Sequence, residues 1–150
     1  MIIVKFSGGL GNQMFQYALG RRLALKNNVP LKLDISEYNE KNLRKYDLSY
    51  FNIIENFATQ KDLRSVAFPS NKAGNEFLIK IHQRIFHLSP IQYVKEQTIN
   101  FRPEIFTLRD NTYLDGYWQS EKYFSDIKDV IRKEFTVKGM PDPINESYLG

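Results

Sequence analysis

The residues best suited to chemistry lie near the N-terminus, in the stretch GGLGNQ that follows a short apolar run. Glycines at three positions, Gly8, Gly9 and Gly11, leave no Cβ in the way, so backbone N–H groups can come close to a ligand. A helix beginning after this loop would add free N–H groups and the positive end of its dipole. Such a loop suits a phosphate or pyrophosphate, with Asn12 capping the helix or binding the ligand. The alternative is a tight turn with an asparagine cap and no ligand.

Two named phosphate-binding motifs do not fit this loop. The dinucleotide fingerprint G-x-G-x-x-G would need a glycine where Met14 stands, and the Gly-Lys-Ser/Thr of a P-loop is absent. Asp34 nevertheless lies about twenty residues beyond the loop, where dinucleotide enzymes keep a ribose-binding carboxylate. The dinucleotide-binding domain of an oxidoreductase therefore stays open as an alternative, although we favour Asp34 as a cap on the following turn.

A second stretch, YLDGYWQSEKYF, combines polar and aromatic residues from position 113 to position 124. It spans the end of an expected strand and the start of an expected helix, a junction that lies at the ligand-binding edge of a parallel sheet. Tyr117 and Trp118 offer flat faces on which sugars pack, while Asp115 and Gln119 offer polar contacts. Core packing beside a helix cap would explain the same residues, and a non-catalytic glycan-binding module also stays open.

The sequence does not suggest a metal or cofactor site. His82 and His87 are five residues apart, which does not place two ligands on one helix face. The chain has no cysteine, so disulfides and thiolate metal sites are excluded. No nucleophile-elbow pattern is visible. We therefore expect neither a metal nor a cofactor.

The elements that must position these residues alternate between strands and helices. The β-branched run at 2–6 predicts a strand covered on both faces, and 13–27 predicts a buried helix in which Gly20 packs closely on the sheet. Residues 30–35 complete a strand–helix–strand unit. The remaining expected elements are strands at 91–96 and 112–118, a strand or extended segment at 46–53, and helices at 59–67 (capped by Thr59), 76–86 and 121–135 (capped by Ser120). The fold class is therefore α/β, with a Rossmann-like parallel sheet flanked by helices.

Length and composition fit one globular domain followed by a linker. Of the 150 residues, 42% are hydrophobic and 25% charged. The net charge of +4 is spread over interleaved acidic and basic residues, so we expect no nucleic-acid partner. No run is long enough for a signal peptide or a membrane span, which predicts a cytoplasmic location with at most a peripheral membrane contact. Residues 1–138 would form the domain, and the Pro- and Gly-containing residues 139–150 a linker.

The two stretches together, with the LDI that follows the first helix, resemble the alpha-1,2-fucosyltransferase family. The resemblance runs from about Ile2 to Val137, which is most of the chain. Bacterial members decorate O-antigens and other surface glycans, and related animal enzymes make blood-group H structures. Family membership implies a two-domain GT-B architecture. It also implies transfer of L-fucose from GDP-fucose to the 2-hydroxyl of a galactoside, with inversion and without a metal.

The resemblance implies a role for each stretch. Five residues would form the cleft loop near the pyrophosphate or fucose of the donor: Gly8, Gly9, Gly11, Asn12 and Gln13. Three would lie at or behind the same cleft, on the acceptor side: Tyr117, Trp118 and Gln119. Asn12 and Asp115 are candidates for a catalytic role.

The chain departs from the family's pattern at one point. The donor-binding signature His-x-Arg-Arg-x-Asp, whose arginines grip the pyrophosphate, does not occur, and Arg21-Arg22 has no histidine two positions before it. The chain therefore resembles the N-terminal half of such an enzyme, and we expect it to be inactive alone. Its expected partners are GDP-fucose, a galactose-containing glycan and a missing C-terminal domain, and its expected location is the cytoplasm, including the cytoplasmic face of the inner membrane.

Overall fold

Four short parallel strands form one sheet in the computed structural model, which describes residues 1–38, 43–66 and 91–139. The strands are β1 (Ile2–Lys5), β2 (Leu31–Asp34), β3 (Gln92–Lys95) and β4 (Thr112–Asp115). Their order in the sheet is β2-β1-β4-β3, and each neighbouring pair is parallel. This arrangement confirms the predicted α/β class with a Rossmann-like sheet.

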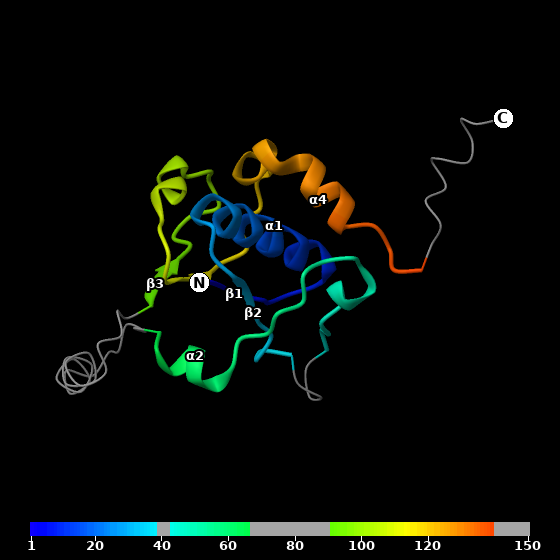
Figure 1. Cartoon of the computed structure of the whole chain (residues 1–150), viewed down its shortest axis with the longest axis horizontal. Coiled ribbons are helices and arrows are strands. Elements are labelled where there is room, and N and C mark those ends of the chain that lie inside the picture. The colour runs from blue at the N-terminus through cyan, green and yellow to red at the C-terminus, as the bar shows by residue number, and fades with distance from the viewer. Residues whose placement is uncertain (39–42, 67–90, 140–150) are drawn as a thin grey trace.

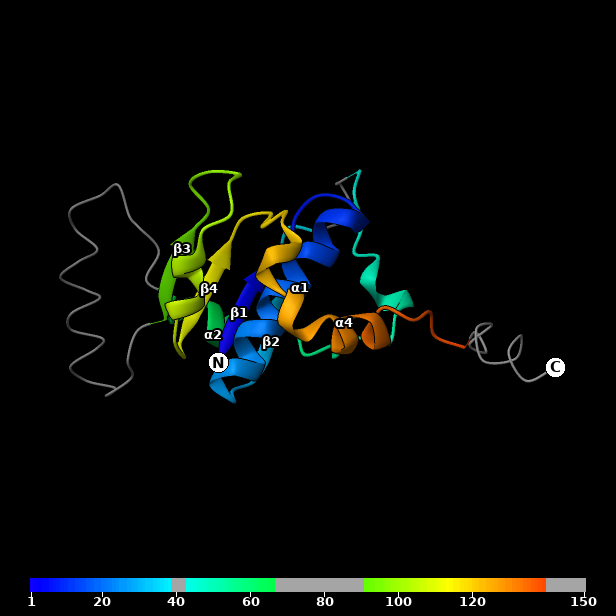
Figure 2. The ribbon, with the colours of Figure 1, turned by 90° about the horizontal axis from the view of Figure 1, so that it is seen from above.

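Helices lie on both faces of the sheet (Figure 1). The long helix α1 (Leu10–Asn27) covers one face, and the shorter α4 (Lys128–Glu134) packs on α1 from outside. On the opposite face lies α2 (Gln60–Arg64) (Figure 2). Short 3₁₀ turns complete the described chain, at Leu48–Tyr50, Pro103–Thr107, Glu121–Tyr123 and Ser125–Ile127.

Side chains alternate between two cores, as the period of a strand requires. Ile2 and Val4 point to the α1 face and join the larger hydrophobic cluster, while Ile3 points to the other face. Tyr113 of β4 lies on that second face, where Leu63 of α2 packs against the cluster. The continuous apolar run in β1 is therefore explained by burial on both faces.

Gly20 seats α1 on the sheet. A Cβ at this position would lie 2.2 Å from Cγ2 of Val4 and 2.9 Å from Cδ1 of Leu31. Because both neighbours are core side chains of the sheet, only glycine allows the helix to approach this closely. The predicted close packing at Gly20 is confirmed.

The first helix begins earlier than the sequence predicts. It starts at Leu10 rather than at residue 13, and Gly9 is its N-cap, without a side chain to cap it. Asn12 therefore lies inside the first turn, which excludes the helix cap as one of the two roles considered for it. Thr59, by contrast, caps α2 as predicted, through a reciprocal bond pair with Asp62.

Three other element predictions need correction. Residues 46–53 contain a 3₁₀ turn instead of a strand, and only Phe51 forms an isolated bridge, to Val137. The strand expected at 112–118 ends at Asp115, and Trp118 takes a positive φ of 56°, outside the range of a strand. The helix expected at 121–135 is broken into two 3₁₀ turns and α4, and the Ser120 side chain makes no cap bond. The expected helix at 76–86, with its neighbour His87, and residues 140–150 of the expected linker lie outside the described residues.

The described segments contain no helix that is both long and apolar enough to cross a membrane.

We expect Gly20→Ala to lower the free energy of unfolding by about 1–3 kcal/mol, because the added methyl group overpacks the contact between α1 and the sheet. Urea denaturation of the purified protein measures this change. Gly11→Ala is the matched control, since a Cβ at Gly11 meets no described atom within 4 Å. Equal stability of the two variants would contradict this account of Gly20.

Candidate functional site

The order of the strands places a candidate ligand-binding crevice at the carboxyl ends of β1 and β4. The chain leaves β1 toward β2 on one side and later returns through β3 to β4 on the other side. In open α/β sheets, ligands bind outside the carboxyl ends of the strands at such a switch point. The loops that leave these two strand ends are the two stretches that the sequence singles out.

Gln16 of α1 ties the two loops together. Its side chain is fully buried, and its Oε1 accepts a hydrogen bond from the backbone N–H of Ser7 at 3.1 Å. Its Nε2 donates to Oγ of Ser7 at 3.2 Å and to the carbonyl oxygen of Gly116 at 3.0 Å. One buried amide therefore fixes the start of the β1 loop against the start of the β4 loop.

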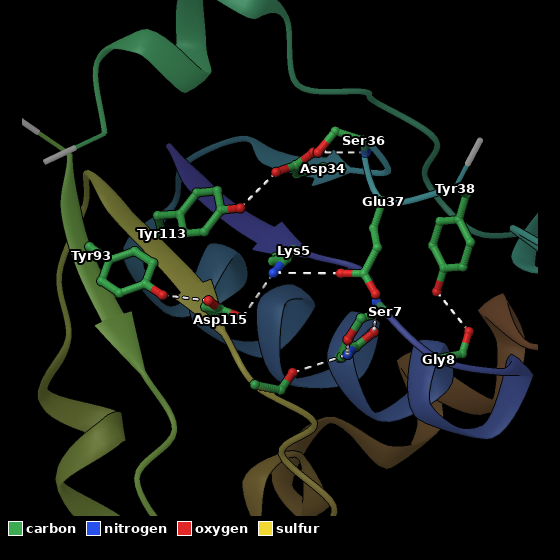
Figure 3. Close-up of polar contacts among 12 residues, drawn as sticks. Lys5, Ser7, Gly8, Asp34, Ser36, Glu37, Tyr38, Tyr93, Tyr113 and Asp115 are labelled. Atoms are coloured by element: carbon green, nitrogen blue, oxygen red, sulfur yellow. Dashed lines mark hydrogen bonds and ion pairs between the residues drawn. The ribbon is translucent and has the colours of Figure 1, made fainter. Parts of the chain in front are cut away.

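Gln13 holds the glycine loop from behind. It is fully buried, and its Nε2 donates to the carbonyl oxygens of Gly8 at 3.2 Å and Lys45 at 2.8 Å, while its Oε1 accepts from the N–H of Asp47 at 2.9 Å. Tyr38 donates its hydroxyl proton to the same Gly8 carbonyl at 2.9 Å (Figure 3). Gln13, predicted to line the cleft, thus has its amide engaged by the protein itself.

The fold requires glycine at only one of the three glycine positions of the loop. Gly8 has a left-handed φ of 76°, and a Cβ there would lie 2.3 Å from Nδ2 of Asn12. A Cβ on Gly9 would meet only the Arg44 guanidinium, at an ordinary 3.6 Å, and one on Gly11 would meet no described atom within 4 Å. The turn therefore requires glycine at position 8, whereas positions 9 and 11 are open toward the surface.

Asn12 and Gln119 bring the two predicted stretches into contact at the surface. Nε2 of Gln119 donates to Oδ1 of Asn12 at 2.6 Å, across 107 positions of sequence. Asn12 is half-buried and Gln119 is exposed. These two amides therefore join the two stretches at the surface of the molecule.

The β4 loop is held in a strained conformation by Glu96. Trp118 has a left-handed φ of 56°, which a bulky residue seldom adopts. The Glu96 carboxylate accepts the N–H of Tyr117 at 2.7 Å and that of Trp118 at 3.1 Å. A Cβ on Gly116 would lie 2.3 Å from Cβ of Glu96, so the glycine lets the two segments approach. These contacts fix the direction in which Gln119 leaves the loop.

The two aromatic residues of this loop point to different places. Trp118 is 1% exposed and packs edge-on against Tyr123, with ring centroids 6.0 Å apart. Its ring lies behind the loop and offers no face to a sugar. Tyr117 is 45% exposed, so its ring is accessible beside Gln119.

A row of charged and tyrosyl groups follows the carboxyl ends of the strands (Figure 3). Nζ of Lys5 lies between two carboxylates, 3.5 Å from Glu37 and 3.6 Å from Asp115. Tyr93 donates its hydroxyl proton to the other oxygen of Asp115. Burial, reinforced by the Asp115 carboxylate, raises the pKa of Tyr93 to about 12, and burial beside Glu37 raises that of Tyr38 to about 12. Both phenols therefore remain hydrogen-bond donors at physiological pH.

Asp34 serves the fold. Its side chain is 4% exposed, accepts the Tyr113 hydroxyl at 2.6 Å and accepts the N–H of Ser36 at 2.9 Å. The second bond confirms the interpretation of Asp34 as a cap on the following turn. Burial and this carboxylate raise the pKa of Tyr113, which keeps its bond to Asp34 intact. A ribose could not reach Asp34 without breaking this pair.

Sequence reasoning missed the residues that organise the site. Five residues act through contacts with segments distant in sequence: Gln16, Tyr38, Glu96, Lys5 and Tyr93. Their only local signal is position, since Lys5 and Glu96 stand at or next to a strand's carboxyl end. In the described part of the chain, no group of three or more His, Asp or Glu side chains could hold a metal ion.

The chain is similar to an alpha-1,2-colitosyltransferase of Escherichia coli, with 29% identity over 137 residues. The match covers 91% of this chain and 45% of the relative, so the chain spans about half of the relative's length. No protein-family model matches the chain. No solved structure matches it either. The similarity links the chain distantly to a glycosyltransferase.

We expect Gln16→Leu to lower the free energy of unfolding by about 1–3 kcal/mol, because the Ser7 N–H and the Gly116 carbonyl lose their buried partner. Amide hydrogen exchange should accelerate at Ser7 and at residues 117–119. Gln119→Leu is the control, because this exposed side chain bonds only Asn12 among the described residues and its loss should cost less than about 0.5 kcal/mol. Unchanged exchange in Gln16→Leu would show that Gln16 does not join the loops.

Proposed function

We propose that this chain is the N-terminal half of a two-domain glycosyltransferase, which transfers L-fucose from GDP-fucose to the 2-hydroxyl of a galactoside. The observation that carries the proposal is the meeting of the two predicted stretches at the switch point, through Gln16 with Gly116 and Asn12 with Gln119. The similarity to a colitosyltransferase across 91% of the chain supports the same reaction class.

The first turn of α1 is suited to the diphosphate of the donor. Its N-cap is Gly9, which has no capping side chain, and the turn contains no acidic residue. The positive end of an eighteen-residue helix therefore faces the loop without a compensating charge. The Arg44 guanidinium lies beside Gly9 and adds a cation. Negative charge develops on GDP as it leaves, and fixed donors of this kind stabilise it.

The other half of the donor site belongs, in this proposal, to a second domain. The arginine pair that would grip the pyrophosphate in the resembling family is absent from these 150 residues. We propose that residues 139–150 lead to the domain that supplies it, so that the chain described above forms one wall of the cleft. Transfer should then require the full-length protein encoded by the native reading frame.

The donor sugar is the most specific part of the proposal. Colitose is L-fucose without its 3-hydroxyl, so the two GDP-sugars differ in one hydrogen-bonding group. A site that binds this hydroxyl would discriminate strongly against the sugar that lacks it. We propose L-fucose as the donor sugar. The test compares the rates of sugar transfer to lactose from GDP-fucose and from GDP-colitose, with the products measured by mass spectrometry. Faster transfer from GDP-colitose would identify colitose, instead of L-fucose, as the donor sugar. No transfer from either GDP-sugar would contradict the proposed function.

Each of the two alternatives depends on a residue that the fold buries. The dinucleotide reading needs Asp34 at a ribose, but Asp34 is buried and bonded to Tyr113 and Ser36. A glycan-binding module would use aromatic faces, and Trp118 offers none. Glycosyl transfer uses the polar loop contacts that both alternatives leave without a role.

We expect Gly11→Ala to weaken GDP binding by the full-length protein about tenfold or more. The new Cβ tilts toward the helix N-terminus, where the diphosphate would approach the N–H groups, and a lost charge-assisted hydrogen bond is worth about 1.5–3 kcal/mol. Isothermal titration calorimetry measures the affinity. Leu25→Ala, near the other end of the same helix, is the control and should bind GDP normally. Equal affinity in both variants would remove the diphosphate from this loop.

We expect Asn12→Ala to reduce the turnover of the full-length enzyme sharply while the fold survives. Gln119→Ala provides a matched comparison, since it removes the same Asn12–Gln119 hydrogen bond from the other side. If Asn12 also contacts a substrate, its variant loses more activity than the Gln119 variant. Melting curves of both variants show whether they are folded. Near-normal turnover of Asn12→Ala would exclude a contact between Asn12 and a substrate.

A further inference from the structure

The proposed reaction needs a group that removes the proton of the acceptor hydroxyl. Resting on the proposed function, we propose that Asp115 is this general base and that Tyr93 and Lys5 are its positioning residues. A base must lie within hydrogen-bond reach of the attacking hydroxyl, so its carboxylate needs a fixed position and an accessible oxygen.

The two oxygens of Asp115 are in different situations (Figure 3). Oδ2 accepts the hydroxyl proton of Tyr93. Oδ1 lies 3.6 Å from Nζ of Lys5, which is an ion pair but longer than a hydrogen bond. Among the described residues, no hydrogen-bond donor reaches Oδ1. The side chain is 21% exposed, so one oxygen is held and the other can receive a substrate hydroxyl.

The backbone around Asp115 is fixed on both sides. The Asp115 carbonyl accepts the N–H of Glu96 at 2.8 Å, and the next carbonyl, that of Gly116, accepts the amide of Gln16. Asp115 is also the last residue of β4, which lies beside β1 at the switch point. The carboxylate is therefore presented by the rigid end of a central strand, next to the loop assigned to the donor.

The other carboxylates near the crevice are less suitable. Both oxygens of Glu96 accept backbone N–H groups of the β4 loop. Asp34 is buried against Tyr113. Glu37 shares Lys5 with Asp115 but is 45% exposed, and it lies on a turn after β2 rather than at the switch point. Asn12 is an amide and cannot accept a proton at neutral pH.

The proposed step balances without a further reactant. The acceptor O–H bond breaks, and its proton moves to Oδ1 of Asp115. The acceptor oxygen forms a bond to the anomeric carbon of the sugar. The bond from that carbon to the diphosphate oxygen breaks, and GDP leaves with the electron pair. Lys5 offsets the negative charge of the two carboxylates before the proton arrives.

The test compares sugar transfer with azide transfer in the full-length protein. Asp115→Asn should reduce fucose transfer to lactose by about 10²–10⁴-fold, the usual contribution of a general base. Azide is already an anion and needs no base, so the variant should form glycosyl azide from GDP-fucose at about the wild-type rate. GDP affinity, measured by calorimetry, should be unchanged and reports that the variant is folded. If the Asp115→Asn variant loses GDP affinity, the same comparison is made with Asp115→Ser.

Two further variants test the positioning role of Tyr93 and provide a control outside the crevice. Tyr93→Phe removes the hydrogen bond that holds Oδ2, and we expect a decrease in kcat without a change in the KM for GDP-fucose. Asp110→Asn removes a carboxylate beside the N-terminal amine, outside the crevice, and should leave all rates unchanged.

Three outcomes would overturn the assignment. Lactose transfer within threefold of wild type in Asp115→Asn would exclude a base at this position. An equal loss of lactose and azide transfer would assign Asp115 to binding or structure. No transfer by the wild-type protein from either GDP-sugar would instead overturn the proposed function, and the base assignment with it.

Discussion

The geometry of the crevice depends on the buried amide of Gln16. Its three hydrogen bonds, to the N–H and Oγ of Ser7 and to the carbonyl of Gly116, join loops that lie a hundred positions apart. The amide can reach both loops only because α1 lies very close to the sheet, and Gly20 permits that distance. A contact in the core thus fixes a polar arrangement at the surface. Because an unpaired buried amide is costly, the bonds of Gln16 form together with the fold.

The opening glycine stretch contains residues that face the protein and residues that face outward. Gly8, Gln13 and Gln16 face the protein: the first allows the turn, and the two amides satisfy buried backbone groups. Gly11 and Asn12 face outward, where the fold does not require their identity. The stretch is therefore a turn that the fold requires at its inward-facing positions, and its outward-facing positions are those left for the proposed ligand. Helical spacing does not separate these positions, because Asn12 lies four residues before Gln16; the contacts that each side chain makes separate them.

The sequence predicts the sheet well because its signals are local. The β-branched run of β1, the apolar helix and β2 all lie within thirty-five residues, and each element forms, although the helix begins three residues earlier than predicted. The failures have non-local causes. The conformation of Trp118 depends on the Glu96 carboxylate, and the burial of Gln13 depends on Lys45 and Asp47. Composition at positions 12–16 therefore predicted a candidate site, but not which of its amides face outward and which face the core.

The distribution of charge around the sheet edge is compatible with the proposal that a donor anion and a carboxylate base share this crevice. The start of α1, with no acidic residue in its first turn, lies on the face that Val4 and Leu114 line. Asp115 and Tyr93 lie with Tyr113 on the opposite face, and Lys5 stands between Asp115 and Glu37. Because Lys5 offsets one of the two negative charges, repulsion of a diphosphate at the helix end is reduced. A donor anion and an acceptor hydroxyl would then approach from opposite faces and meet at the carboxyl ends of β1 and β4.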